Sequence, residues 1–319
     1  MSGGTRQILS AHIAHNTRED EPNAPPIEIL NKVDNDPAPP WEFWYTNQMY
    51  HGPGVPLPDG SKMKGCDCVG KCDPRSKTCQ CVARQRVFFD GTDDHGLGFI
   101  YDKQRRLRPL LAGYAIWECN DLCGCDEDCM NRVVQRGRTV QVSIQKTENK
   151  GWGVFAGPKK IPRGTFLGVY AGEILNEEDS HVRGQVYEKW GRTYLFDIDF
   201  YYLERLEKKE PVYTVDAYHA GNFTRFLNHS CDPNAKLYAC YINESYIAKP
   251  LLVVFSLRDI EPHEEICFSY TGIYPGEEDD DDRDAEAPAI KRAEWKKCYC
   301  GSANCCGEWI RCVLKLERG

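Results

Sequence analysis

Nine cysteines crowd the segment between Cys66 and Cys129, in two runs separated by a gap. The first run has the spacing Cys-x-Cys-x3-Cys-x6-Cys-x-Cys, and the second has the spacing Cys-x3-Cys-x-Cys-x3-Cys. Cys-x-Cys pairs do not meet the geometry of a disulfide with each other, but they can share a metal ion. Three tetrahedral zinc ions need twelve ligand positions, which six terminal and three bridging thiolates supply. The spacing therefore predicts a three-zinc module held by Cys66, Cys68, Cys72, Cys79, Cys81, Cys119, Cys123, Cys125 and Cys129.

A disulfide framework in a secreted protein is the alternative interpretation of these cysteines. The chain has 17 cysteines, an odd number, and its first ten residues are polar, so we expect no secretory signal peptide. We also expect no transmembrane helix, because no apolar run approaches the length that spans a bilayer. Close cysteines in a reducing compartment are more often metal ligands than disulfides. These observations favour metal binding.

The charge of the chain bears on its partners. The formal net charge is -8 at pH 7, and an acidic surface disfavours a direct electrostatic grip on DNA phosphates. The same charge suits a basic partner, such as a peptide rich in lysine and arginine, although charge alone favours a solvated surface with no partner. We therefore expect no sequence-specific DNA binding and no membrane partner.

Changes of composition along the 319 residues mark five segments. Residues 1–40 are polar and rich in proline and aspartate, which predicts a mobile N-terminal tail. Residues 41–135 contain an aromatic strap and then the nine cysteines. Residues 136–275 have the pattern of a folded domain, residues 276–296 are an acidic and then basic loop, and residues 297–319 begin with more cysteines.

The segment 136–275 consists mainly of short runs that alternate apolar and polar residues, punctuated by glycine and proline, as half-buried strands do. One helix is expected from 177 to 190, with Asn176 as its N-cap. No glycine fingerprint of a nucleotide-binding fold is present. The pattern predicts a mostly β domain with few helices and several small sheets. The expected strands are 140–144, 153–156, 166–170, 194–198, 213–216, 251–255 and 265–270.

A second cysteine set follows the acidic loop. Cys298, Cys300 and Cys305 supply three ligands, so a tetrahedral site needs a fourth from elsewhere. Cys231 is the best candidate, because it lies in a polar segment rich in turns, although a lone cysteine is often only a small buried apolar residue. Cys306 competes with its neighbour Cys305, but the spacing favours Cys305. We expect one further zinc ion here.

Four short motifs complete the pattern: Asn228–Asn234 (NHSCDPN), Gly151–Gly153 (GWG), Tyr170–Glu173 (YAGE) and Phe268–Tyr270 (FSY). In their order along the chain (GWG, YAGE, NHSCDPN, FSY) they resemble the SET-domain protein lysine methyltransferases. The nine-cysteine block resembles the pre-SET module of that family, and the last cysteines resemble its post-SET module. Together they are similar to the histone H3 lysine-9 methyltransferases of the suppressor-of-variegation class, including fungal members. The resemblance covers roughly residues 40 to 312.

The resemblance implies a fold and a division of the chain. It implies a SET-domain fold of several small curved sheets with a pseudoknot. A triangular three-zinc pre-SET module and a one-zinc post-SET tail would flank it. Residues 41–135 then correspond to the pre-SET zinc module with its strap, residues 136–275 to the SET catalytic domain, and residues 297–319 to the post-SET zinc module.

It also implies a reaction, the attack of a lysine amine on the sulfonium methyl group of S-adenosylmethionine. This transfer needs alignment of donor and acceptor and a deprotonated lysine, whose free pKa is near 10.4. A narrow apolar channel favours the neutral amine, and aromatic walls accommodate the methylated cation. The family's motifs carry catalytic roles onto Tyr270, Tyr170, Tyr194 and Phe268, and cofactor contacts onto Lys150, Gly151, Trp152, Gly153, Tyr194, Arg225, Asn228 and His229.

The expected substrate is the histone H3 tail, with lysine 9 as the target, in the nucleus on chromatin. An aromatic without a hydroxyl at Phe268 implies di- or trimethylation, in the service of heterochromatin formation and gene silencing. The chain shows no methyl-lysine reader before the cysteines, so a chromatin-targeting partner is expected. Two alternatives remain open: a methyltransferase for another histone or non-histone lysine, and a catalytically silent chromatin scaffold.

Overall fold

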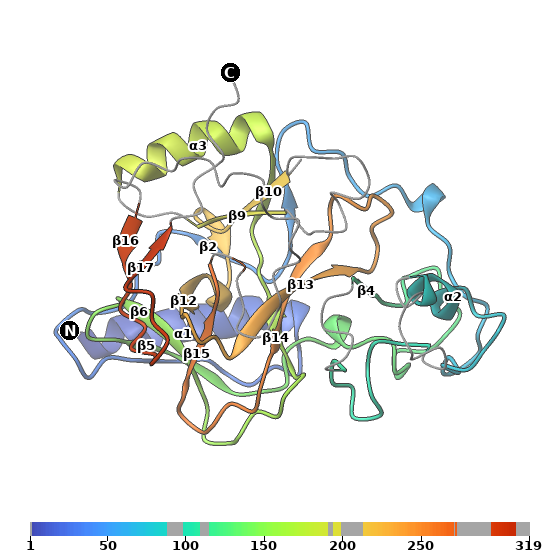
Figure 1. Cartoon of the computed structure of the whole chain (residues 1–319), viewed down its shortest axis with the longest axis horizontal. Coiled ribbons are helices and arrows are strands. Elements are labelled where there is room, and N and C mark those ends of the chain that lie inside the picture. Colours follow the sequence, from blue (N-terminus) through green and yellow to red (C-terminus); the bar gives the residue numbers. More distant parts are fainter. Residues whose placement is uncertain are drawn as a thin grey trace.

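The computed structural model describes residues 2–87, 98–108, 115–190, 194–198, 213–270, 272 and 295–310. Within these residues short strands dominate, and the predicted mostly β fold with few helices is confirmed (Figure 1). The α-helices of the described part are α1 (Ser2–Asp20), α2 (Gln80–Arg86) and α3 (Glu177–Lys189).

The largest sheet brings together strands from distant parts of the chain. Its order is β1 (Glu28–Leu30), β5 (Val142–Lys146), β6 (Trp152–Ala156), β15 (Glu265–Phe268) and β12 (Asn228–His229). The parallel pairing of β12 with β15 sets His229 opposite Phe268. Two of the motifs noted in the sequence therefore meet at one edge of this sheet.

Two four-stranded sheets and two strand pairs complete the described β structure. One sheet has the order β3 (Tyr50–His51), β8 (Glu173–Asn176), β10 (Tyr213–Asp216) and β9 (Leu195–Asp197). The other has the order β4 (Ile116–Trp117), β13 (Ala235–Tyr241), β14 (Leu251–Ser256) and β7 (Phe166–Val169). The pairs are β2 (Trp44–Tyr45) with β11 (Ala220–Gly221), and β16 (Trp295–Lys297) with β17 (Glu308–Ile310).

The helix predicted from 177 to 190 is α3. The Oδ1 atom of Asn176 accepts a hydrogen bond from the Asp179 N–H at 2.8 Å, so Asn176 is the N-cap that the sequence indicated. Acidic residues fill the first turn and Lys189 lies in the last, which suits the helix dipole at both ends. The helix buries Tyr187, whose hydroxyl donates to Asp216 on β10 at 2.8 Å. This contact fixes α3 on its sheet.

The prediction of a mobile tail for residues 1–40 is wrong. Residues 2–20 form α1, which packs against β1 and β2, and β1 pairs in parallel with β5 (Figure 1). The side chains of Leu9 and Ile13 are buried in the main core. They lie four residues apart on one helix face, a signal that the polar average composition of the segment concealed.

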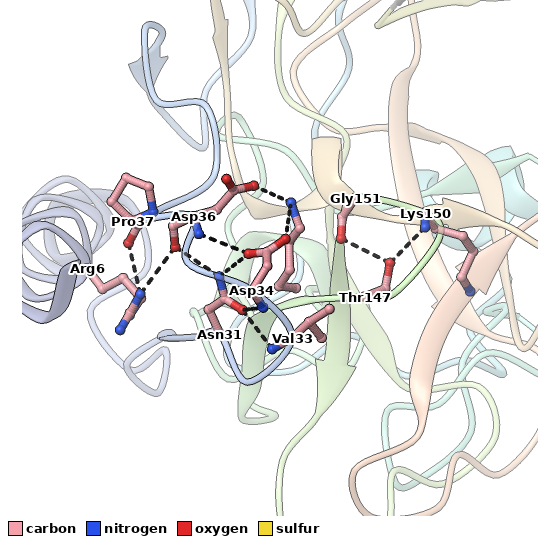
Figure 2. Close-up of polar contacts among 10 residues, drawn as sticks. Arg6, Asn31, Val33, Asp34, Asp36, Pro37, Thr147, Lys150 and Gly151 are labelled. Atoms are coloured by element: carbon pink, nitrogen blue, oxygen red, sulfur yellow. Dashed lines mark hydrogen bonds and ion pairs between the residues drawn. The ribbon is translucent and has the colours of Figure 1, made fainter.

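The loop after β1 is tied to both α1 and the central sheet. Arg6 on α1 donates to the carbonyl of Pro37 at 3.1 Å, and Lys146 at the end of β5 forms ion pairs with Asp34, at 3.3 Å, and with Asp36 (Figure 2). Asn31 closes the loop by donating to Asp34 at 2.8 Å. The N-terminal segment is therefore a packed part of the domain.

The nine-cysteine module, Cys66 to Cys129, lies around α2 at one end of the molecule, while β16 and β17 lie toward the other end, near α3 (Figure 1). The module joins the domain through β4, which pairs with β13, and through a stacked contact of Trp117 with Tyr241 at 4.1 Å between ring centroids. The segment between the two cysteine runs thus contributes, through β4, the joint between the module and the domain.

Candidate active site and metal centres

Eight of the nine thiols of the module form overlapping groups, and the ninth, Cys129, has its sulfur 4.0 Å from that of Cys119. Within each group the sulfur atoms lie within 4.8 Å of one another, and Cys66, Cys72 and Cys119 belong to more than one group. The Cys66 and Cys72 sulfur atoms are 3.5 Å apart, and those of Cys72 and Cys119 are 3.8 Å apart. Thiolates shared between neighbouring metal ions need these positions. The remaining six thiols lie outside this central set: Cys68, Cys79, Cys81, Cys123, Cys125 and Cys129.

Hydrogen-bond donors surround these sulfur atoms. Backbone N–H groups of Cys66 and Asn120 donate to the Cys123 sulfur at 3.4 and 3.3 Å. The guanidinium groups of Arg84 and Arg132 each approach a further sulfur at 3.6 Å. Donors of this kind stabilise thiolate, the form that binds zinc. The sulfur set and its surroundings therefore fit structural zinc.

The second thiol group joins two distant segments. The sulfur atoms of Cys231, Cys298, Cys300 and Cys305 lie within 4.8 Å of one another, and we call this set the four-cysteine site. Cys231 follows β12, whereas the other three follow β16. Cys231 thus occupies the fourth position, as the incomplete set in the sequence indicated, and the arrangement fits one tetrahedral zinc ion.

Aromatic rings enclose the end of β15. Ring centroids are 5.0 Å apart for Phe268 and Tyr270, 6.0 Å for Phe268 and Phe196, and 5.8 Å for Phe196 and Tyr170. Phe196 was not among the candidate residues. It lies two residues after Tyr194 on a predicted strand, so its side chain points to the same face, and this periodicity was the available signal. The rings form a continuous apolar wall.

Two tyrosine hydroxyls in this wall donate to backbone carbonyls. Tyr270 donates to the carbonyl of Leu227 at 2.7 Å, and Tyr170 donates to the carbonyl of Tyr194 at 3.1 Å. Burial raises the pKa of Tyr270 well above its usual value. The phenol is therefore protonated at neutral pH, and its oxygen can act as a hydrogen-bond acceptor.

Arg225 lies between two aromatic rings next to this wall. Its guanidinium carbon is 3.9 Å from the ring centroid of Phe43 and 4.1 Å from that of Tyr194. Its Nε donates to the carbonyl of Ala217 at 2.8 Å and its Nη2 to that of Tyr218 at 3.2 Å. Its Nη1 is buried and has no hydrogen-bond partner within the described part of the chain. A buried unpaired donor is costly, so the site fits a ligand that presents an acceptor.

A polar network underlies the glycine motif. Asn228 donates through Nδ2 to Glu265 Oε1 at 2.9 Å and to the carbonyl of Trp152 at 3.3 Å, and Lys150 forms an ion pair with the other carboxylate oxygen of Glu265. A Cβ atom at Gly153 would lie 2.6 Å from the Glu265 carboxylate and 2.9 Å from the Asn228 amide, so a larger residue here would displace this network. Glu265 was not predicted, because nothing in its local sequence distinguishes it from other strand-edge acids.

His229 connects the aromatic wall to the four-cysteine site. Its Nδ1 accepts a hydrogen bond from the backbone N–H of Tyr270 at 3.1 Å, and its Nε2 lies 3.5 Å from the sulfur of Cys231. Burial, assisted by the charge of Lys150, lowers the pKa of His229 to about 4. The ring is therefore neutral at neutral pH, with its proton on Nε2.

The glycine motif sits on a tight hairpin that the N-terminal loop supports. Thr147 donates through its backbone N–H to the carbonyl of Gly151 at 2.7 Å, and its hydroxyl accepts from the Lys150 N–H at 3.0 Å (Figure 2). The ammonium of Lys146 lies 5.7 Å from the ring centroid of Trp152. The N-terminal segment is thereby connected to a candidate cofactor contact.

Part of the predicted organisation lies outside the described residues. This applies to most of the acidic and basic loop at 276–296 and to residues 311–319. Within the described part, no helix is both long enough and apolar enough to cross a membrane.

Comparison with known proteins identifies what the chain is similar to. The SET domain family matches residues 151–271, and the Pre-SET motif family matches residues 18–132. A histone-lysine N-methyltransferase of Cryptococcus neoformans, described as H3 lysine-9 specific, is 42% identical over 321 residues, which cover 90% of this chain and 17% of that protein. The chain spans less than two thirds of the length of the first curated relatives it matches.

Solved structures agree with this assignment. The Neurospora SET domain protein DIM-5, a histone lysine methyltransferase, superimposes with a TM-score of 0.66 at 32% identity, covering 77% of this chain and 95% of that one. KRYPTONITE, in complex with mCHH DNA, an H3(1-15) peptide and SAH, superimposes with a TM-score of 0.66 at 27% identity, covering 89% of this chain and 51% of that one.

Proposed function

The chain belongs to the SET-domain family and carries its pre-SET module, and from this premise we propose that it transfers methyl groups from S-adenosylmethionine to lysine 9 of the histone H3 tail. The observation that carries the proposal is the aromatic wall of Tyr170, Phe196, Phe268 and Tyr270 beside the unpaired Nη1 of Arg225. A wall of this kind suits a lysine side chain, and the unpaired donor suits the cofactor.

The residues that would hold the cofactor lie on three elements. Trp152 and Gly153 begin β6, Asn228 and His229 form β12, and Arg225 lies on the short helix before it, Phe223–Phe226. S-adenosylmethionine, when bound, supplies an electrophilic methyl group. Asn228 is held in place by its hydrogen bond to Glu265, and both side chains pack against Gly153.

The aromatic wall would act on the lysine. Because it is apolar and largely buried, it disfavours the ammonium form and lowers the pKa of an inserted lysine. The hydroxyls of Tyr270 and Tyr170 donate to carbonyls, so toward the amine their oxygen atoms serve as acceptors that orient its hydrogens. Phe268 and Phe196 then face a methylated cation, which aromatic rings stabilise. Alignment and desolvation supply the catalysis.

We propose lysine 9 of histone H3 as the target. The Cryptococcus relative is named for this specificity, and the KRYPTONITE complex contains an H3 peptide. The net charge of -8 suits a basic tail. An extended tail would bind by adding to a strand edge, with main-chain hydrogen bonds for affinity and side-chain pockets for specificity. Heterochromatin formation in the nucleus, with a targeting partner, is the corresponding biological role.

We propose four zinc ions in the complete protein, three in the nine-cysteine module and one in the four-cysteine site. The sharing of Cys66, Cys72 and Cys119 among thiol groups supports the first number. The metals would be structural, because every ligand position is taken by a thiolate and none is left for a reactant.

We propose di- or trimethyl-lysine as the product, because Phe268 carries no hydroxyl that would hold a water molecule beside the amine. Replacing it tests this directly. Phe268→Tyr is expected to shift the product toward monomethyl-lysine with little loss of the first transfer. A mass-spectrometric time course of peptide methylation measures it, and an unchanged product distribution would contradict the assignment.

The experiment for the proposed function is mass spectrometry of an unmodified H3-tail peptide incubated with the protein and S-adenosylmethionine. A peptide with lysine 9 replaced by alanine serves as the matched substrate control, and Tyr270→Phe as the matched enzyme control. We expect successive additions of methyl mass to the unmodified peptide only. The Tyr270→Phe variant should transfer methyl groups about 100-fold or more slowly. Transfer to the alanine peptide would move the target to another lysine, and no transfer by zinc-loaded protein would overturn the proposal.

A further inference from the structure

Five thiols gather at a site that needs four. The sulfur of Cys306 lies 3.5 Å from the sulfur of Cys231, closer than the 3.9 Å that separates Cys231 from Cys298. Cys306 is exposed, whereas Cys298 is buried and Cys300 is half-buried. A tetrahedral zinc ion held by the four-cysteine site leaves the Cys306 thiol in excess and in contact with a ligand.

The turn that carries Cys306 is fixed against Cys231. Asn304 donates through Nδ2 to the carbonyl of Cys231 at 3.1 Å, and a backbone hydrogen bond from Cys306 reaches the Cys231 sulfur. The Cys298 N–H donates to the carbonyl of Gly307 at 2.9 Å, which closes the turn on its other side. Contacts on both sides of Cys306 therefore hold its thiol beside the Cys231 sulfur.

We propose that Cys231 and Cys306 are an oxidative modification site, at which a hydroperoxide converts the two thiols to a disulfide and displaces zinc from the four-cysteine site. The chemistry needs only the two sulfur atoms and the metal. Its consequence for methyl transfer rests on the proposed function.

The steps balance with hydrogen peroxide as the oxidant. The exposed Cys306 thiolate attacks one peroxide oxygen, the O–O bond breaks, and the products are a sulfenic acid and hydroxide. The Cys231 thiolate then attacks the Cys306 sulfur, the S–O bond breaks, and a second hydroxide leaves. Two sulfur atoms lose one electron each, and the two peroxide oxygens gain them. A disulfide requires about 2.05 Å between sulfur atoms, so the pair must approach by roughly 1.5 Å, which side-chain rotation of the exposed Cys306 can supply.

Oxidation would replace the metal link between the two segments by a Cys231–Cys306 bond, and the other three ligands would lose the thiolate that completes their tetrahedral site. Cys231 is the ligand that the segment after β12 contributes, and the other three ligands belong to the C-terminal segment. His229, which contacts the Cys231 sulfur and the backbone of Tyr270, would then face a neutral disulfide sulfur in place of a metal-bound thiolate. The modification would therefore affect the aromatic wall through His229.

The nine-cysteine module has no exposed thiol that corresponds to Cys306. Each of its cysteines is buried or half-buried, and none of them is exposed. We expect the module to keep its metal under oxidant concentrations that modify Cys306, because exposure and thiolate character control the reaction.

The test uses the zinc-loaded chain treated with graded hydrogen peroxide. Zinc release is followed with a chromophoric chelator, and the thiol pairing is mapped by mass spectrometry after alkylation. We expect one zinc ion per chain to leave first, together with a Cys231–Cys306 disulfide, and a thiol reductant with added zinc to restore the starting state. Cys306→Ala should release zinc several-fold more slowly, whereas Cys240→Ala, which removes a buried thiol outside both thiol clusters, should match the original chain.

Each other outcome overturns the inference. Equal release rates for the original chain and Cys306→Ala, or a disulfide between other cysteines, would exclude the pair. A Cys306→Ala protein purified with one zinc ion fewer would make Cys306 a ligand. These readouts do not depend on methyl transfer: if no form of the protein methylates the peptide, the proposed function fails while the result on the thiol pair stands.

Discussion

The two thiol clusters of this chain use the same ligand chemistry in different surroundings. In the nine-cysteine module seven of the nine cysteines are buried, and all come from one region of the chain. In the four-cysteine site only Cys298 is buried, and Cys231 lies 67 residues before it. The first cluster is the core of its module, whereas the second joins two segments that lie far apart in the sequence.

This difference predicts different consequences of losing metal. In the nine-cysteine module three thiols belong to more than one ligand group, so one broken ligand disturbs several metal positions at once. In the four-cysteine site we expect a single metal ion to hold two chain segments together, so its loss should leave the main core unchanged. We expect metal binding to supply much of the folding free energy of the nine-cysteine module. In the four-cysteine site we expect it only to hold two chain segments together.

The largest expected effect comes from a bridging position. Cys119→Ser is expected to remove more than one zinc ion and to destabilise the module by several kcal/mol, because Cys119 is fully buried and lies in two ligand groups. Metal content by atomic emission and thermal unfolding measure the two effects. Cys240→Ser, a buried cysteine outside the clusters, is the control, with an expected cost of about 1–3 kcal/mol for its buried hydroxyl and no loss of zinc. If Cys119→Ser retained all its zinc, the proposed difference between the two thiol clusters would be wrong.

The second effect is large on activity and small on stability. Cys300→Ser is expected to lose one zinc ion and about 100-fold in methyl transfer, because the metal site would no longer fix Cys231, whose neighbour His229 positions the backbone of Tyr270. Its unfolding temperature should stay close to that of the original chain. Peptide methylation and circular dichroism, run on the same preparation, separate the two. A fall in unfolding temperature as large as that of Cys119→Ser would make the two clusters equivalent.

A smaller effect concerns the charge of the nine-cysteine module. Three zinc ions and nine thiolates carry a net charge of about -3, and Arg132 approaches the Cys125 sulfur at 3.6 Å. Arg132→Met should lower the free energy of unfolding by about 1–2 kcal/mol through the lost charged hydrogen bond. Chemical denaturation measures it. Lys62→Met, which removes only an exposed ion pair with Asp59, is the control and should change the same quantity by less than about 1 kcal/mol. Equal effects of the two substitutions would show that the arginine does not serve the cluster.

The parts of the molecule that could be predicted from sequence are those with local signals. The spacing of the nine cysteines is such a signal, and so is the cap of α3 at Asn176. Cys231 could be proposed because three ligands demanded a fourth. The strand β10 coincides with the run expected at 213–216.

The parts that sequence reasoning missed depend on tertiary contacts. Helix α1 was concealed because two buried side chains, Leu9 and Ile13, stabilise a segment of polar average composition. Phe43 is distant in sequence from Arg225, and only the fold places its ring on the guanidinium. Glu265 supports Asn228 through a side-chain contact that no local pattern records.

The most direct test of this account follows zinc release and peptide methylation together during a slow titration with chelator. The account predicts that methyl transfer disappears as the first of four zinc ions leaves, while the circular dichroism spectrum is still that of the folded protein. The remaining three ions should leave later, together with unfolding. Methyl transfer that persists after the first ion has left, or release of all the metal in a single step with unfolding, would contradict it.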